Sequence, residues 1–410
     1  MLTSLALIFL GGMLLGSIFT KLKLPSLIGM LITGMIVGPY VLNRIDDSLL
    51  AISTDLRQLA LVIILTRAGL SLDLNDLKRV GRPAILMCFV PACFEIVGMV
   101  LIAPKLMGIT VLEAAVMGTV VAAVSPAVVV PRMLKLMENG YGIDKSIPQL
   151  IMAGASVDDV FVIVLFTSFT SLANGGSISP VRILEIPVSI VLGIVVGAVL
   201  GRLLSSLFKN IHIRDSAKVV ILLSMAFLLM ALEQRLKTIV PFSGLLAVMA
   251  IGIAMLRFYP VLANRLSAKF SKLWVAAEIV LFVLVGATVD MGYAVSSGPN
   301  TIFLLILVLL FRMTGVLVCL LRTSLNRREK LFCTVAYIPK ATVQAAIGGI
   351  PLAMGLACGN MVLTAAVLSI LITAPLGAFG IDVLYKKCLS GENLSDRHEQ
   401  NMQQHNEHTL

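Results

Sequence analysis

The sequence predicts an all-α polytopic membrane protein, and three observations support this fold class. Hydrophobic residues make up 58% of the 410 residues, charged residues make up only 13%, and the mean hydropathy is +1.01. A soluble chain usually carries about 25% charged residues, which cover its surface. The apolar residues also fall into about thirteen runs, each near the roughly 20 residues that one helix needs to cross a bilayer.

The same composition excludes several classes of protein. So few charged residues argue against a cytosolic enzyme and against a nucleic-acid binder, although the net charge is +10. In a membrane protein such an excess of basic residues is typical of cytoplasmic loops. The six cysteines form no Cys-x-x-Cys pair, and most lie in apolar runs. We therefore interpret them as small hydrophobic residues, not as a disulfide framework or metal ligands.

The expected spans follow one another along the whole chain. Their approximate ranges are 2–20, 26–42, 56–72, 82–104, 110–134, 147–172, 183–201, 219–234, 239–256, 273–290, 301–321, 329–356 and 361–385. No basic residue precedes the first run, whereas Lys21 and Lys23 follow it. The first run is therefore a retained helix, not a cleaved signal peptide. Its Gly12-xxx-Gly16 pair allows close helix packing, for example at a dimer interface, or it lies in a helix that merely faces lipid.

Basic residues orient these helices. If odd-numbered helices run inward, most of the 32 Lys and Arg residues fall on the cytoplasmic side, and the outer side keeps only a few, among them Arg44 and Arg57. The positive-inside rule then places the N-terminus outside and the C-terminus in the cytoplasm. We expect residues 1–388 to form the transmembrane domain and residues 389–410, rich in Gln, Asn and His, to form a short disordered cytoplasmic tail.

The two halves of the chain share a weak pattern. The third run ends in Gly69-Leu70-Ser71-Leu72-Asp73, and the tenth ends in Gly286-Ala287-Thr288-Val289-Asp290. Each half then has an ionisable residue at the same distance from its Asp, and a proline further along. An odd number of spans separates each matching pair, so the halves enter the membrane in opposite directions. We therefore predict two inverted five-helix repeats, over about 24–172 and about 239–386.

Ionisable residues inside the spans need an explanation, because a charge at the bilayer centre costs about 2.5–3.5 kcal/mol. The deep ones are Arg67, Glu95, Asp158, Asp159, Glu278, Arg312 and Lys340. Glu95 and Arg312 occupy equivalent positions in the two repeats, so we expect a buried ion pair between them. This pair either takes part in chemistry or only holds the repeats together, and we favour the structural role.

Asp158 and Asp159 are the strongest functional signal in the sequence. They lie midway along an apolar run, where a helix-capping role fits poorly. Neighbouring positions on a helix point about 100° apart, so the two carboxylates face different surroundings while each still feels the other's charge. A buried carboxylate that exchanges a proton for a hard cation is what competition between protons and cations requires.

Two prolines interrupt spans at matching repeat positions. Pro126 lies in Val124-Ser125-Pro126-Ala127, and Pro339 lies in Ile338-Pro339-Lys340-Ala341-Thr342. A proline removes a backbone hydrogen bond and opens the helix. Irregular backbone at membrane depth is tolerated only where it lines a cavity or is buried by protein. The opened ends present carbonyl groups to a cation, and we expect Lys340 to compensate the facing helix dipoles.

Four stretches of the chain resemble the monovalent cation/proton antiporters and, among these, the NHA-type sodium/proton exchangers. They are Leu24-Pro25-Ser26-Leu27-Ile28-Gly29 with Gly34 and Gly38-Pro39, then Ala123-Val124-Ser125-Pro126, then Ser156-Val157-Asp158-Asp159, and Ile338-Pro339-Lys340-Ala341-Thr342-Val343-Gln344-Ala345-Ala346. The resemblance covers essentially the whole chain short of its tail. It implies a homodimer, crossed discontinuous helices, and a core domain that moves like an elevator against a dimerisation domain.

The resemblance also implies roles for single residues. Asp159 binds the cation and the proton, and Asp158 forms a salt bridge with a nearby cation, for which Lys340 is the first candidate. We expect an oxygen-rich site without a cofactor or a tightly bound metal, completed and shaped by Ser125, Ser156, Pro126, Pro339 and Thr342. Several electrogenic relatives carry Lys where this chain has Arg312. Arginine stays protonated and cannot release a second transported proton, whereas a buried Lys340 on the next helix could. Both electroneutral and electrogenic exchange are therefore left open.

The expected function is therefore not enzymatic. It is secondary antiport of Na⁺ and Li⁺ against H⁺ across the cell membrane. A potassium/proton antiporter of the same superfamily would share nearly every feature, and a sodium-coupled symporter of organic solutes is a second alternative. An intramembrane aspartyl protease is disfavoured, because its two carboxylates must come from separate helices, whereas Asp158 and Asp159 are neighbours.

Overall fold

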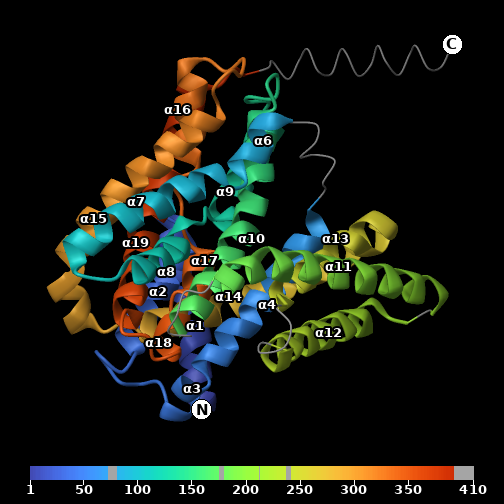
Figure 1. The fold of residues 1–410 in the computed structure, drawn as a ribbon, viewed down its shortest axis with the longest axis horizontal. Helices are drawn as coiled ribbons and strands as arrows, with labels where there is room; N and C mark the ends of the chain where they lie inside the picture. Colours follow the sequence, from blue (N-terminus) through green and yellow to red (C-terminus); the bar gives the residue numbers. More distant parts are fainter. Residues whose placement is uncertain (73–80, 175–179, 212, 237–241, 392–410) are drawn as a thin grey trace.

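The computed structural model describes residues 1–72, 81–174, 180–211, 213–236 and 242–391 (Figure 1). The helices of the first half are α1 (Leu2–Lys21), α2 (Ser26–Val37), α3 (Asp47–Ala51), α4 (Ser53–Ser71), α6 (Arg82–Met87), α7 (Val90–Met107), α8 (Val111–Ala122), α9 (Pro126–Glu138) and α10 (Ile147–Asn174). Those of the second half are α11 (Pro180–Asn210), α12 (Asp215–Leu236), α13 (Gly244–Phe258), α14 (Pro260–Ala287), α15 (Met291–Cys319), α16 (Arg327–Ala336), α17 (Thr342–Ile347), α18 (Ile350–Ala353) and α19 (Gly359–Cys388). Asp73 and residues 392–410 of the expected tail lie outside the described residues.

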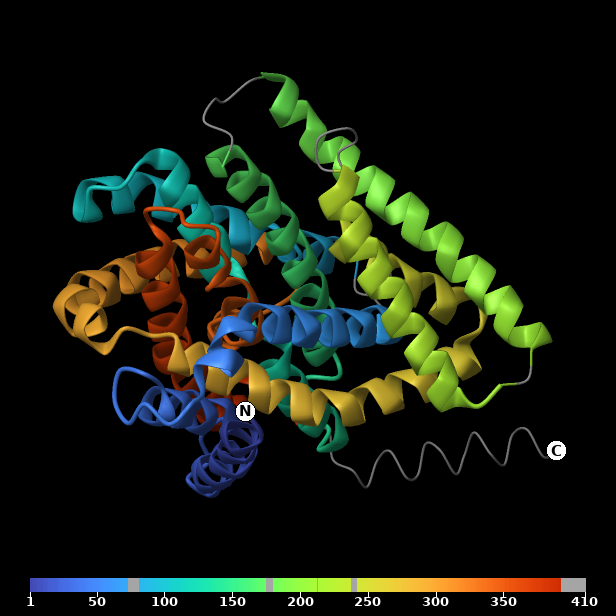
Figure 2. The ribbon, with the colours of Figure 1, turned by 90° about the horizontal axis from the view of Figure 1, so that it is seen from below.

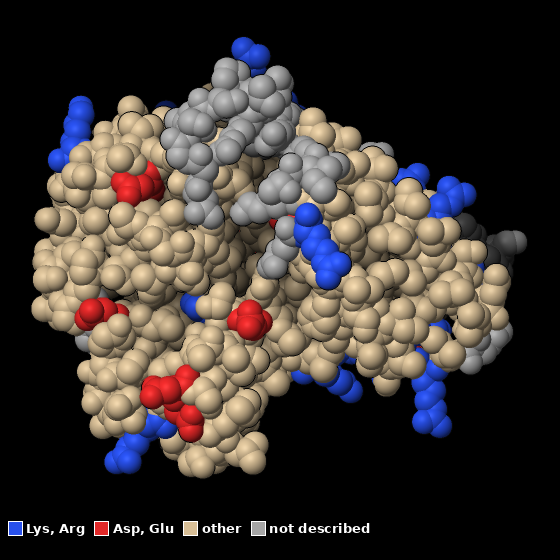
Figure 3. Space-filling view, turned by 60° about the horizontal axis from the view of Figure 1, so that its bottom comes forward, with Lys and Arg blue, Asp and Glu red and all other residues tan. Residues whose placement is uncertain are grey.

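The predicted class, an all-α membrane protein, is confirmed. In the described part of the chain, 9 helical segments are long and apolar enough to cross a membrane, and three shorter apolar helical segments accompany them. Figure 3 shows a face made mostly of uncharged residues, with Lys and Arg projecting mainly near its rim. The span expected to reach residue 42 ends earlier, at Val37. Gly38 is extended there because the following Pro39 disfavours the helical conformation in the residue before it.

The long helices pack into two groups. The first helix group consists of α1, α2, α4, α11, α12, α13 and α14, and the second helix group consists of α6–α10 and α15–α19. Figures 1 and 2 both show α11 and α12 on the opposite side of the molecule from α7 and α15. The groups meet where α4 and α14 contact α17 and where α10 contacts α11. This seam positions the candidate site described below.

Glycines allow helices of the first helix group to approach backbone to backbone. A Cβ at Gly34 of α2 would collide with the carbonyl oxygen of Val283 in α14, and a Cβ at Gly286 would collide with the carbonyl oxygen of Leu31. Such small residues stabilise helix pairs in membranes through close van der Waals contact.

The Gly12-xxx-Gly16 pair of α1 packs within the chain. Gly12 lies against Ile279 of α14, and Gly16 lies against Ser26 of α2. Both glycines are buried, on the same face of α1 as Ile8. The close helix packing expected of this pair is therefore present, and its partners are helices of the same chain. The reason for this packing is local. The connection after Lys21 is short, so α2 folds back directly onto the small-residue face of α1.

Replacing Gly286 by Ala should destabilise the protein by about 1–3 kcal/mol, the usual effect of overpacking a tight contact. The collision partner is backbone, which cannot rotate away. Thermal unfolding of the purified protein in detergent measures the effect. Gly298→Ala is the matched control, because nothing lies within 4 Å of a Cβ at that helical position. Equal unfolding temperatures for the two variants would contradict the backbone contact.

Candidate functional site

Two interrupted helices meet in the second helix group. The break between α8 and α9 covers residues 123–125, and the break between α16 and α17 covers residues 337–341. The backbone N–H of Ser125 donates a hydrogen bond to the carbonyl oxygen of Pro339 at 2.7 Å, so the two breaks touch directly. Pro126 is the first residue of α9, a position that suits its fixed φ and missing N–H.

The free carbonyl groups at the end of α8 are covered by side chains from the second half of the chain. The Lys340 ammonium donates to the oxygen of Val121 at 2.6 Å, the Gln344 amide donates to that of Ala123 at 2.8 Å, and Arg312 donates to that of Ala122. The last carbonyls of a helix lack partners within the helix, and cations are favoured at this negative end. The break therefore persists with its backbone polar groups satisfied.

Arg312 of α15 holds a buried network of charges together. Its Nη1 donates to Glu95 Oε2 of α7 at 3.0 Å, its Nη2 donates to Asp158 Oδ2 of α10 at 2.9 Å, and its Nε donates to the oxygen of Tyr337 at 2.9 Å. Lys340 Nζ adds an ion pair to Glu95 at 2.8 Å. The four charged side chains are at most 2% exposed. Two cations face two carboxylates, so the network is balanced in charge.

The ion pair expected between Glu95 and Arg312 is present, but the expected partner of Asp158 is wrong. Asp158 pairs with Arg312, and its Oδ2 also accepts the backbone N–H of Val124 at 2.8 Å. Lys340 pairs with Glu95 instead. Its backbone lies in the break beside α8, so its ammonium reaches the end of α8 and Glu95 together.

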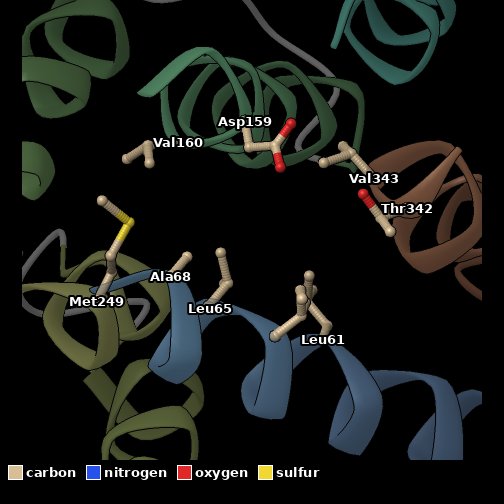
Figure 4. A pocket seen from close by; sticks show the side chains of 9 residues that line it. Leu61, Leu65, Ala68, Asp159, Val160, Met249, Thr342 and Val343 are labelled. Atoms are coloured by element: carbon tan, nitrogen blue, oxygen red, sulfur yellow. The ribbon is translucent and has the colours of Figure 1, made fainter. Parts of the chain in front are cut away.

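Asp159 has a different environment from its neighbour. No hydrogen bond or ion pair involves it within the described part of the chain, and its Oδ1 is buried without a partner. It lines a cavity of about 20 Å³ between the two helix groups. Figure 4 shows its carboxylate at this cavity, opposite Leu61 and Leu65 of α4 and beside Thr342 of α17. A space of this size holds about one water molecule.

A comparison with known families identifies the chain. The family model described as "Sodium/hydrogen exchanger, transmembrane" matches residues 5–387. The chain belongs to this family. It is therefore a multi-pass membrane protein of an exchanger family, and the resemblance seen in the sequence motifs is confirmed.

Vertebrate relatives and a solved structure agree with the family. The chain is 32% identical to human sodium/hydrogen exchanger 9B2, over 93% of this chain and 73% of the relative. It is 34% identical to mouse sodium/hydrogen exchanger 9B1, over 93% of this chain and 69% of the relative. The structure of the sodium proton antiporter MjNhaP1 from Methanocaldococcus jannaschii matches with a TM-score of 0.82, covering 94% of this chain and 97% of that one. At 20% identity, this likeness shows the shared fold.

The structure of this exchanger-family chain brings some of the expected site residues together and separates others. Thr342 shares the cavity with Asp159, whereas Ser125 does not line it. The Ser125 hydroxyl is buried in the break and has no partner. The side chain of Ser156 lies outside the described residues. Sequence reasoning missed Gln344, although a polar amide in an apolar span is the same kind of signal as the buried charges.

Replacing Arg312 by Gln should destabilise the protein by about 3–5 kcal/mol, because it leaves Glu95 and Asp158 with too little positive charge. Thermal unfolding of the purified protein measures the loss, and Arg214→Gln, at an exposed arginine, is the control. Adding Asp158→Asn to Arg312→Gln should recover part of the stability, because the double variant no longer buries that uncompensated carboxylate. Strict additivity of the two single effects would contradict the pairing.

Proposed function

We propose that the protein exchanges Na⁺ and Li⁺ for H⁺ across the cell membrane, with Asp159 binding cation and proton in turn. One observation carries the proposal: Asp159 lines a cavity with its Oδ1 buried and without a partner among the described residues, while its neighbour Asp158 is paired with Arg312. The names of the relatives support the choice of ions, because these relatives are sodium/hydrogen exchangers. The solved structure with the same fold is that of a sodium proton antiporter, which supports the same choice.

The chemistry of Asp159 follows from the burial of its Oδ1 at the cavity. An ionised carboxylate without a partner is strongly unfavourable in a protein interior. A proton removes the negative charge of the carboxylate, and a bound cation compensates that charge. The single negative charge does not serve both a proton and a cation at once. Binding of one therefore releases the other. Carboxylate and hydroxyl oxygens suit a hard cation, and the Thr342 hydroxyl lines the same cavity as Asp159.

Arg312 gives the two neighbouring carboxylates different roles. Asp158 forms an ion pair with Arg312, whose guanidinium stays protonated at all physiological pH values. Asp158 is therefore not free to take up the transported ion, although its charge still acts on Asp159. The pairing leaves Asp159 as the carboxylate of the two that responds to protons and cations.

The arrangement of the helices supports elevator-type alternating access. Asp159 belongs to the second helix group and faces Leu61, Leu65 and Met249 of the first. These contacts are apolar, so the groups can slide past one another without breaking ion pairs. Glu95, Asp158, Arg312 and Lys340 all lie within the second helix group. The charged network thus travels as a unit with the ion site.

We also propose that the N-terminus lies outside the cell, that the C-terminus lies in the cytoplasm, and that the protein is a homodimer. The concentration of basic residues in alternate loops supports the orientation. Large apolar side chains on the outer face of α1, such as Leu10, Met13 and Leu14, are exposed in the single chain. They are suited to contact with lipid or with a second copy.

Asp159→Asn should abolish exchange without preventing insertion into the membrane. The amide does not bind or release a proton, and it has no negative charge to compensate that of a bound cation. The measurement is collapse of a proton gradient in proteoliposomes after separate addition of Na⁺, Li⁺ and K⁺. Asp47→Asn, at an exposed position of α3, is the control and should retain full activity. Robust Na⁺-driven proton flux in the Asp159 variant would exclude the proposed role. A response of the unmodified protein to K⁺ alone would indicate a potassium/proton antiporter, and no response to any cation would favour an organic-solute symporter.

Thr342→Val should raise the apparent KM for Na⁺ by about 2–10-fold, which corresponds to the loss of one polar contact of about 0.5–1.5 kcal/mol. The maximal rate should change little, since valine keeps the size of threonine. Initial rates of Na⁺-dependent proton flux provide both values. Thr314→Val, at an exposed position of α15, should leave both unchanged. An unaltered KM in the Thr342 variant would remove this hydroxyl from the ion site.

A further inference from the structure

A second cavity lies at the seam between the helix groups, away from Asp159. Its volume is about 160 Å³, and it shares no lining residue with the cavity of Asp159. Ser53, Thr54 and Arg57 of α4 line it from the first helix group, and Gly349 and Leu352 line it from the second. Hydroxyl groups and a guanidinium thus line a space between the two groups.

Arg57 is buried in this cavity wall with an incomplete set of partners. The sequence places it among the basic residues of the outer surface, but only 5% of it is exposed. Its Nε donates to the carbonyl oxygen of Ser53 at 3.3 Å and its Nη2 donates to the Thr54 hydroxyl at 3.2 Å. Its Nη1 is buried without any hydrogen-bond partner and lies against Gly349.

Arg57 differs from the other buried cations of the described chain. Arg312 pairs with Glu95 and Asp158, Lys340 pairs with Glu95, and Lys218 pairs with Asp215 at 3.6 Å. Arg57 has no carboxylate within ion-pair distance among the described residues. A buried charge without a counter-charge is destabilising by several kcal/mol. The cavity beside Arg57 therefore has room for a negatively charged ligand that would compensate the charge of the guanidinium.

We propose that this cavity binds a small monovalent inorganic anion such as chloride. Arg57 supplies one positive charge, and the other lining residues supply hydroxyl groups and apolar surface but no second cation. A singly charged ion would leave the site neutral, whereas a doubly charged phosphate would leave a negative charge uncompensated in a partly apolar pocket. The Thr54 hydroxyl, which accepts from Arg57, still has its own proton to donate to an anion.

The position of the site between the two helix groups links anion binding to transport. Because its lining comes from both helix groups, a bound anion contacts both and favours the relative position that they have in this structure. This consequence rests on the proposed movement of the groups. Binding itself does not, and it is therefore measured without Na⁺ or Li⁺.

Thermal unfolding of the purified protein in choline chloride and in choline gluconate tests the proposal. Chloride should raise the unfolding temperature of the unmodified protein, because a ligand that binds only the folded state stabilises it. Arg57→Gln should lose the difference between the two salts, whereas Arg44→Gln, at an exposed arginine, should keep it. An equal chloride effect in Arg57→Gln would overturn the proposal. Stabilisation by an anionic phospholipid with no response to chloride would also overturn it and would assign the site to a lipid headgroup.

Direct binding of radioactive chloride keeps the proposal testable if Arg57→Gln does not fold. Thr54→Val removes the hydroxyl, and Gly349→Ala places a methyl group where the guanidinium lies. Both should weaken chloride binding several-fold, and unchanged binding in both would refute the site. Asp159→Asn should bind chloride like the unmodified protein. A failure of the transport proposal and a failure of the anion site are thus separate results.

Discussion

The pairing of Arg312 with both Glu95 and Asp158 is the interaction on which the rest of the structure depends. It joins α7, α10 and α15, and further bonds to the oxygens of Tyr337 and Ala122 connect it to both helix breaks. Arginine suits this position because its planar group offers several donors in fixed directions. Removing it would leave Asp158 without a cation within ion-pair distance among the described residues, because Lys340 pairs with Glu95.

This pairing also creates the asymmetry between two adjacent carboxylates. Asp158 faces Arg312 and the backbone of Val124, whereas Asp159 points to the seam between the helix groups. The roughly 100° turn between successive helix residues is sufficient to separate the two environments. One helix in one orientation therefore gives Asp158 an ion pair and leaves Asp159 at the cavity between the groups. The same seam holds Arg57, a cation whose counter-charge the described chain does not supply.

The sequence by itself determined the membrane class, the approximate spans, the buried Asp pair and the breaks at Pro126 and Pro339. These features have local causes. Apolar length, the cost of intramembrane charge and the missing N–H of proline act within a few residues and do not need tertiary contacts. The proximity of Glu95 and Arg312 was also accessible, because the predicted internal repeat assigns them equivalent positions.

Only the tertiary structure decided which charges pair and which glycines make contacts. Lys340 binds Glu95 instead of Asp158, Arg57 is buried, and Gly12 packs within the chain. Long, flexible Lys and Arg side chains reach several partners at similar distances. The choice among those partners is set by how helices far apart in the sequence pack together, and no local pattern of residues records that packing.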